Sequence, residues 1–201
     1  MNTIPSVNLK DFLSDNPIRK QNFVNAIGQA YEEIGFVALK GHFLDDTLVD
    51  NLYTEVKNFF CLPTETKRQY EIPGIGGQRG YVSFGKESAK GKKEGDLKEF
   101  WHFGQYVENN NKLKAEYPDN VNVKELPEFN KTGKETYRML EKTAKYVLRA
   151  LALHLGLEET YFDEYIYNGN SILRPIHYPP ITEEPKEAVR AAAHGDINLI
   201  T

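Results

Sequence analysis

The sequence predicts an α+β fold in a chain long enough for one domain, or for one domain with a small terminal subdomain. Three segments place apolar residues at helical spacing, and four short runs are rich in β-branched and aromatic residues. Of the 201 residues, 40% are hydrophobic and 27% are charged, a balance typical of folded proteins. The predicted helices cover 17–34, 45–60 and 128–155, and the predicted strands cover 36–39, 80–85, 100–103 and 171–178.

The N-terminal elements follow from capping and breaking residues. The first helix is expected to begin at Pro17, because Asn16 can cap its amino end and proline is favoured in the first turn. It is expected to end at Gly35, and the apolar run 36–39 that follows at once indicates a strand. The second helix presents an apolar stripe along one face and stops before Pro63.

Loops separate the remaining elements. The stretch 72–80 holds four glycines and one proline in nine residues, a density that no regular element tolerates. The charged, aperiodic stretch 86–98 indicates a solvated mobile loop. After the long helix, the run 171–178 indicates a strand that prolines break, and the small residues of 191–201 are also compatible with a strand. Two strands alone do not form a stable sheet, so their partners must be earlier strands, another chain or residues beyond this sequence.

Charge and cysteine content exclude several classes of protein. Lys and Arg number 25 and Asp and Glu 29, so the net charge of −4 lacks the basic footprint of a nucleic-acid binder. Cys61 is the single cysteine, which excludes an internal disulfide and an all-thiolate zinc site. The first residues lack the pattern of a secretory signal, and no apolar run is long enough to span a membrane. We therefore expect a soluble, cytoplasmic protein that binds neither nucleic acid nor membranes.

The tripeptide His194-Gly195-Asp196 has the clearest chemical implication. In an extended chain, residues i and i+2 point to the same face, so one imidazole and one carboxylate can bind the same metal ion. They would supply two of the three ligands in the two-histidine, one-carboxylate site that holds Fe(II) with open positions. A surface turn with an Asp–His hydrogen bond is the alternative interpretation.

The surroundings of this tripeptide favour the iron site. The stretch 173–180, which contains a Tyr-Pro pair, together with 190–196, resembles the isopenicillin N synthase-like family of Fe(II)- and 2-oxoglutarate-dependent oxygenases. The N-terminal half is similar to the same family in the same order, so the resemblance covers essentially the whole chain. The matching segments there are 4–9, 33–42, 59–60, 62–67, 79–81 and 98–100.

The resemblance implies roles for several side chains. His194 and Asp196 match the first two iron ligands, and Tyr178 matches a pocket tyrosine that can hydrogen-bond a bound carboxylate, here that of 2-oxoglutarate. Arg79 and Tyr81 match a loop that lies near the substrate in relatives. For Arg79 a solvated loop cation is the alternative, and for Tyr178 an aromatic side chain packed in the core.

Strand alternation adds two residues to the predicted site. Arg174 and Ile176 share the parity of Tyr178 and are therefore expected on the same, substrate-facing side, whereas His177 is expected to face away. His42, His102, His154 and His177 lack a motif and are not expected as the third iron ligand; His102 is expected in the core or in a pocket wall. The family's distal histidine, and the Arg-x-Ser pair that binds the far carboxylate of 2-oxoglutarate, are expected beyond Thr201.

The resemblance also implies a fold and an activity. The family fold is a mainly β double-stranded β-helix, or jelly roll, with N-terminal helices and a long scaffold helix, and we expect its C-terminal part to be missing from this chain. Residues 1–110 would form the N-terminal oxygenase region, and residues 111–201 the long helix and the start of the jelly roll. The implied reaction is oxidation of an unactivated C–H bond of a small molecule with Fe(II), O2 and 2-oxoglutarate.

Two alternatives stay open at this point. One is an oxidase of the isopenicillin N synthase or ACC oxidase type that uses no 2-oxoglutarate. The other is a truncated, non-catalytic interaction module, whose unfinished sheet edge would pair with another chain. The sequence does not determine the substrate or the oligomeric state.

Overall fold

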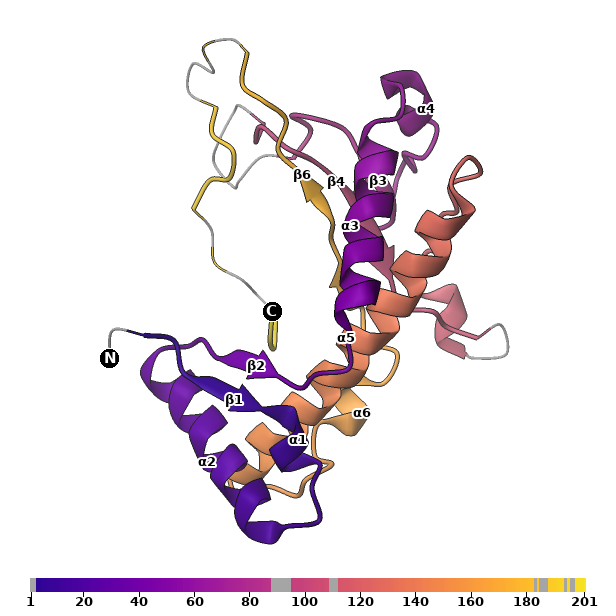
Figure 1. The fold of residues 1–201 in the computed structure, drawn as a ribbon. Helices are drawn as coiled ribbons and strands as arrows, with labels where there is room; N and C mark the ends of the chain where they lie inside the picture. The colour runs from indigo at the N-terminus through magenta and orange to yellow at the C-terminus, as the bar shows by residue number, and fades with distance from the viewer. Residues whose placement is uncertain are drawn as a thin grey trace. The chain divides into compact units, whose positions relative to one another are not determined.

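The computed structural model describes residues 3–87, 95–108, 112–182, 184, 188–193, 195 and 198–201 (Figure 1). These residues form helices and short strands. In chain order they are β1 (Ser6–Asn8), α1 (Leu9–Phe12), α2 (Pro17–Glu33), β2 (Ala38–Lys40), α3 (Asp46–Phe60), α4 (Thr64–Arg68), β3 (Gly80–Val82), β4 (Glu99–Gly104), a 3-10 helix (Lys112–Ala115), α5 (Pro127–His154), α6 (Asp163–Ile166), β5 (Ile172–Leu173) and β6 (Ile176–His177).

The three predicted helices are confirmed as α2, α3 and α5, with ends that differ by one residue at most. Asn16 caps α2 as expected, since its side chain accepts hydrogen bonds from two backbone N–H groups of the first turn. Gly35 ends the helix with a φ of 80°, a conformation that glycine adopts at no steric cost.

The predicted strands 36–39 and 80–85 are shorter in the structure, as β2 and β3, whereas 100–103 is longer, as β4. The run 171–178 forms two separate strands, because Pro175 has no N–H to donate to a ladder and its carbonyl instead accepts from the backbone N–H of Trp101 at 3.0 Å. The strand suggested for 191–201 is wrong for the residues described there, which lie in bends and irregular backbone. In the charged stretch 86–98, residues 88–94 lie outside the described residues, but Asp96 and Lys98 are buried rather than solvated.

The chain divides into two compact units, and α5 contributes to both. The first unit contains residues 1–46 and 138–169. In it, β1 pairs in parallel with β2, with Val7 opposite Leu39. Phe12, Phe23 and Ile27 are buried in its core.

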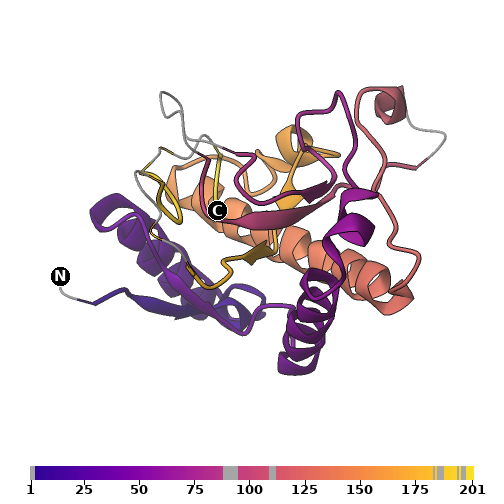
Figure 2. The same cartoon turned by 90° about the horizontal axis from the view of Figure 1, so that it is seen from above.

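The second unit contains residues 47–137 and 170–201 and carries the larger sheet. Its central strand is β4, which pairs antiparallel with β3, β5 and β6; Figure 1 shows β4 between β3 and β6. All six residues of β4 are buried, and the strand is seen from above in Figure 2.

Alternation along β4 separates two environments. Trp101 and Phe103 pack into an aromatic core, where Phe59 and Phe129 stack with ring centroids 5.0 Å apart. Phe100 and His102, which have the opposite parity, line a pocket instead.

Candidate functional site

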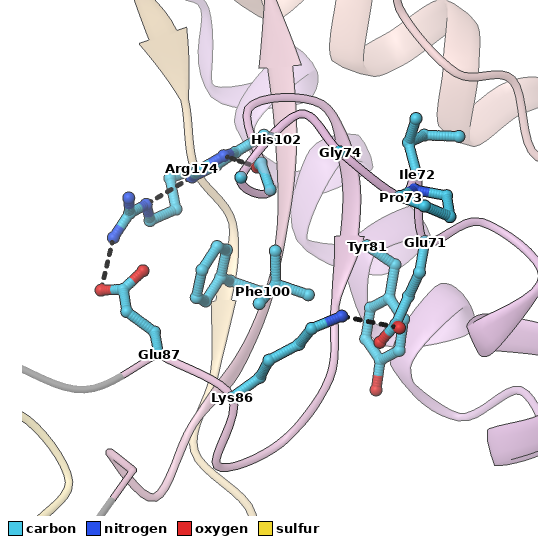
Figure 3. Close-up of a pocket in the computed structure, with 13 residues that line it drawn as sticks. Glu71, Ile72, Pro73, Gly74, Tyr81, Lys86, Glu87, Phe100, His102 and Arg174 are labelled. Atoms are coloured by element: carbon cyan, nitrogen blue, oxygen red, sulfur yellow. Dashed lines mark hydrogen bonds and ion pairs between the residues drawn. The ribbon is translucent and has the colours of Figure 1, made fainter. Parts of the chain in front are cut away.

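A pocket of about 380 Å³ opens on the second unit, next to β4 (Figure 3). The glycine-rich loop predicted over 72–80 supplies much of its wall, and β3, β4, the residues after β3 and the segment between β5 and β6 supply most of the remainder. A volume of this size accommodates a small organic molecule. The lining residues are Glu71, Ile72, Pro73, Gly74, Gly76, Gly77, Tyr81, Val82, Lys86, Glu87, Phe100, His102 and Arg174.

Arg174 and His102, which both line the pocket, are joined by a hydrogen bond. Nε of Arg174 donates a hydrogen bond to Nε2 of His102 at 2.6 Å, and Nδ1 of His102 lies 2.6 Å from the carbonyl oxygen of Gly77. A guanidinium N–H can only donate, so Nε2 of His102 must accept and the ring proton must sit on Nδ1, from where it is donated to Gly77. Both ring nitrogens are thus committed, and the imidazole is neutral in this arrangement.

The electrostatics of His102 agree with the neutral form. Burial, and after it the positive charge of Arg174, lower the pKa of His102 to about 4. At neutral pH the ring therefore acts as a hydrogen-bond acceptor toward Arg174. The prediction that His102 belongs to the core or to a pocket wall is confirmed, since the residue is buried and lines the pocket.

Two ion pairs lie at the pocket, on opposite sides in Figure 3. Lys86 contacts Glu71 at 2.9 Å. Arg174 lies 3.4 Å from Glu87, whose carboxylate is closer to the buried Lys98, at 3.1 Å.

Tyr81 lines the pocket, but its hydroxyl is already engaged. The hydroxyl donates to the buried carboxylate of Glu99, which also accepts from Nζ of Lys67 at 2.8 Å and lies 2.7 Å from Nδ1 of His177. Burial alone would raise the pKa of Glu99, but the hydrogen bonds from these three partners outweigh it and hold the pKa below its ordinary range. Burial and the bond to Glu99 raise the pKa of Tyr81, so its phenol stays protonated.

Arg79 is fully buried and is therefore not a solvated loop cation. Its guanidinium donates to the side chains of Gln105 and Asn170 and to the backbone carbonyl of Gln78. It packs against Gly104, where an added Cβ would lie 1.9 Å from Cζ of the guanidinium. Arg79 does not line the pocket described above, and its role in substrate binding stays a prediction.

The structure brings only some of the predicted site residues together. Tyr81 and Arg174 share the pocket, whereas Ile176 and Tyr178 do not line it and are each 38% exposed. His194 and Asp196 lie outside the described residues, so their role as metal ligands stays a prediction.

Sequence reasoning missed the cluster of Lys67, Glu99 and His177, in which the first two side chains are buried and His177 is partly exposed. The parity of β4 carried a usable signal, because Phe100 and His102 alternate with Trp101 and so share one face of the strand. The contacts of Lys67 had no such signal, since its partner lies 32 positions further along the chain.

Comparison with known proteins identifies the class. A family model described as the N-terminal region of non-haem dioxygenases in morphine synthesis matches residues 4–125. A 2-oxoglutarate-Fe(II) type oxidoreductase of Emericella nidulans is 27% identical over 98% of this chain and 59% of that protein. A crystal structure of a 2OG-Fe(II) oxygenase family protein from Caulobacter crescentus is 38% identical, with a TM-score of 0.84 over 98% of this chain and 62% of that chain. A full-length Neurospora crassa protein, solved in complex with alpha-KG, is 26% identical, with a TM-score of 0.69 over 88% of this chain and 51% of that one.

The chain therefore belongs to the isopenicillin N synthase-like family of Fe(II)/2-oxoglutarate oxygenases, and the resemblance inferred from its sequence is confirmed. It spans about three fifths of the length of the first two relatives. Among the described residues, no helix is long and apolar enough to cross a membrane.

Proposed function

We propose that the protein is an Fe(II)- and 2-oxoglutarate-dependent dioxygenase that oxidises an unactivated C–H bond of a small molecule with O2. The family match over residues 4–125, together with the His194-Gly195-Asp196 pattern further along the chain, carries this proposal. The relatives support the cofactors: one is named a 2-oxoglutarate-Fe(II) type oxidoreductase, and the Neurospora crassa protein was solved with alpha-KG.

The donor types fit the metal. The imidazole of His194 and the carboxylate of Asp196 are ligand types that Fe(II) accepts in sites with open positions. Among the described residues, no group of three His, Cys, Asp or Glu side chains could hold a metal ion. We propose that a further histidine completes the site with His194 and Asp196. Fe(II) and 2-oxoglutarate, once bound, would supply the oxidising chemistry with O2.

The residues of this chain would bind and orient the organic molecules. Tyr178 would donate a hydrogen bond from its phenol to a carboxylate of 2-oxoglutarate. Arg174 and Ile176, from one side of the strand segment, and the ring of Tyr81 would contact the substrate. The apolar pocket wall would exclude water from the reacting C–H bond.

The finer description of the fold is part of the same proposal. We propose a double-stranded β-helix, with β3 to β6 as its first strands. Residues 1–110 would form the N-terminal oxygenase region, and residues 111–201 the long helix and the start of the jelly roll. A cytoplasmic location belongs to the proposal as well.

Exchange of one predicted ligand tests the function. The 201-residue chain alone is expected to be incomplete for activity, so the test uses the full-length protein with the expected distal histidine. That protein should bind about one Fe(II) ion and convert 2-oxoglutarate to succinate, and Asp196→Ala should lose both properties because a site with one ligand fewer holds iron weakly. The exposed Asp15 provides a matched control, and Asp15→Ala should retain iron and succinate release. Normal iron content and succinate release in Asp196→Ala would refute the proposal, and O2 uptake that needs no 2-oxoglutarate would favour an oxidase instead.

A further inference from the structure

Arg174 is fixed at the pocket by contacts that leave part of its guanidinium unused. Its Nε is bonded to His102, and Cζ lies 4.5 Å from the ring centroid of Phe100, as expected for a cation–π contact. Nη1 has only the 3.4 Å contact with Glu87, and Nη2 donates no hydrogen bond within the part of the chain that the structure describes.

We infer that Arg174 recognises a carboxylate of the substrate, and that His102 is a positioning residue that holds the guanidinium for this contact. The inference rests on the proposed function, because it names the substrate class of that site: a small, largely apolar carboxylic acid. Nη1 and Nη2 present parallel N–H groups at the spacing of two carboxylate oxygens, which favours bidentate recognition.

Arg174 and Lys86, the two cationic side chains that line the pocket, differ in how closely a carboxylate neutralises them. Lys86 is paired with Glu71 at 2.9 Å, whereas the partner of Arg174, Glu87, is shared with Lys98 and lies closer to it. The positive charge of Arg174 is thus less neutralised by a protein carboxylate than that of Lys86. A carboxylate of a ligand would therefore be attracted to Arg174 more strongly than to Lys86.

His102 acts on Arg174 through geometry. Its Nε2 accepts from Nε, and its Nδ1–H is anchored on the carbonyl of Gly77, so the ring connects the guanidinium to the backbone of the glycine-rich loop. Because the neutral ring adds no positive charge, it fixes Arg174 without repelling it. An arginine held in this way loses little rotamer freedom when it binds a ligand.

The remainder of the wall selects the body of the ligand. Ile72, Pro73, Val82 and the rings of Tyr81 and Phe100 supply apolar surface. The hydroxyl of Tyr81 is committed to Glu99, so this residue offers its ring and not a hydrogen bond. A volume of about 380 Å³ accommodates an aromatic or branched aliphatic acid of modest size.

A pair of matched probes tests the inference. Phenylacetate and phenylacetamide have nearly the same shape and differ in charge, and their Kd values can be measured by ligand-observed NMR on the purified protein with a chelator present and 2-oxoglutarate absent. We expect phenylacetate to bind about tenfold more tightly than the amide. Arg174→Gln should abolish this preference and leave amide binding unchanged, and Lys86→Gln, the matched control, should retain it.

Two variants of His102 separate positioning from a general structural role. His102→Gln keeps an acceptor for Nε of Arg174 and should keep most of the preference, whereas His102→Leu removes the acceptor and should lose most of it. Unchanged amide binding shows in each case that the pocket is intact. If His102→Leu does not fold, the ratio of the two Kd values in His102→Gln decides, and a ratio near one with intact amide binding overturns the positioning role.

Several results would overturn the inference. They are binding of neither probe at up to about 10 mM, equal Kd values in the unmodified protein, and a preference that Lys86→Gln removes or that Arg174→Gln retains. These readings use neither iron nor 2-oxoglutarate, so their failure is distinguishable from failure of the proposed function, which iron content and succinate release report.

Discussion

The buried ion pair between Lys67 and Glu99 allows a quantitative prediction. Each side chain is 7% exposed, and Nζ of Lys67 donates to both carboxylate oxygens, at 2.8 and 3.0 Å, and to the carbonyl of Phe60 at 3.1 Å. Lys67→Met keeps the apolar stem but leaves the Glu99 carboxylate buried without its cation. Removal of one partner of such a pair costs about 3–5 kcal/mol, and we expect a loss in this range in the free energy of unfolding at pH 7.

Urea denaturation of a double-mutant cycle measures this loss. Glu99→Gln in the Lys67→Met background removes the unpaired charge, so the double variant should recover about 2 kcal/mol relative to the sum of the single changes. The single-variant loss should also shrink as the pH falls toward about 4, because protonated Glu99 needs no counter-ion.

A surface pair provides the matched control. Lys131 and Glu128 lie in the same unit, one turn apart on α5, with side chains 71% and 67% exposed. Lys131→Met should change the free energy of unfolding by less than about 0.5 kcal/mol. A loss below about 1 kcal/mol for Lys67→Met, or strict additivity in the cycle, would refute the reasoning that Glu99 is a buried anion that depends on Lys67.

Three further predictions concern stability. Because the pKa of His102 in the folded protein is about 4, below the ordinary value of 6.5, protonation favours unfolding, and acidification from about pH 7 to 5 should cost about 2 kcal/mol. Urea titrations of the unmodified protein and His102→Gln should show this difference, and parallel pH profiles would contradict it. Gly104→Ala should cost about 1–3 kcal/mol by displacing the buried Arg79, measurable as a lower Tm, and an unchanged Tm would contradict the packing. Asn16→Ala should cost about 1 kcal/mol in urea denaturation by removing the cap of α2, whereas Asn16→Asp should not.

The family could be inferred from the sequence because several segments along the chain resemble it in the same order, and the helices could be predicted because their ends are set locally. Helix ends follow from Asn16, Pro17 and Gly35, whose effects act within one turn, and the structure reproduces α2 within one residue. Strand ends were less predictable, because a strand needs a partner. The run 171–178 splits at Pro175, and its two halves find their partners on β4, about 70 residues earlier.

The candidate site was predicted only in part. Arg174, from strand parity, and Tyr81, from the family resemblance, were expected near the substrate, and both line the pocket. The bond between Arg174 and His102 joins residues 72 positions apart, and no periodicity encodes it. Arg79 reads in the sequence as an exposed loop cation or a substrate contact, but only the packing around Gly104 and Gln105 reveals that it is buried.

The sequence by itself thus determined the positions of the helices and the residue types available for an iron site, because short-range spacing encodes them, and its resemblance to relatives along the whole chain indicated the family. Only the tertiary structure decided which side chains are buried and how they are charged: it made His102 a neutral acceptor, placed the hydroxyl of Tyr81 on Glu99 and paired Lys67 with that same carboxylate. The physical reason is that burial and hydrogen bonding depend on neighbours brought together through space, and these neighbours set the pKa of each group.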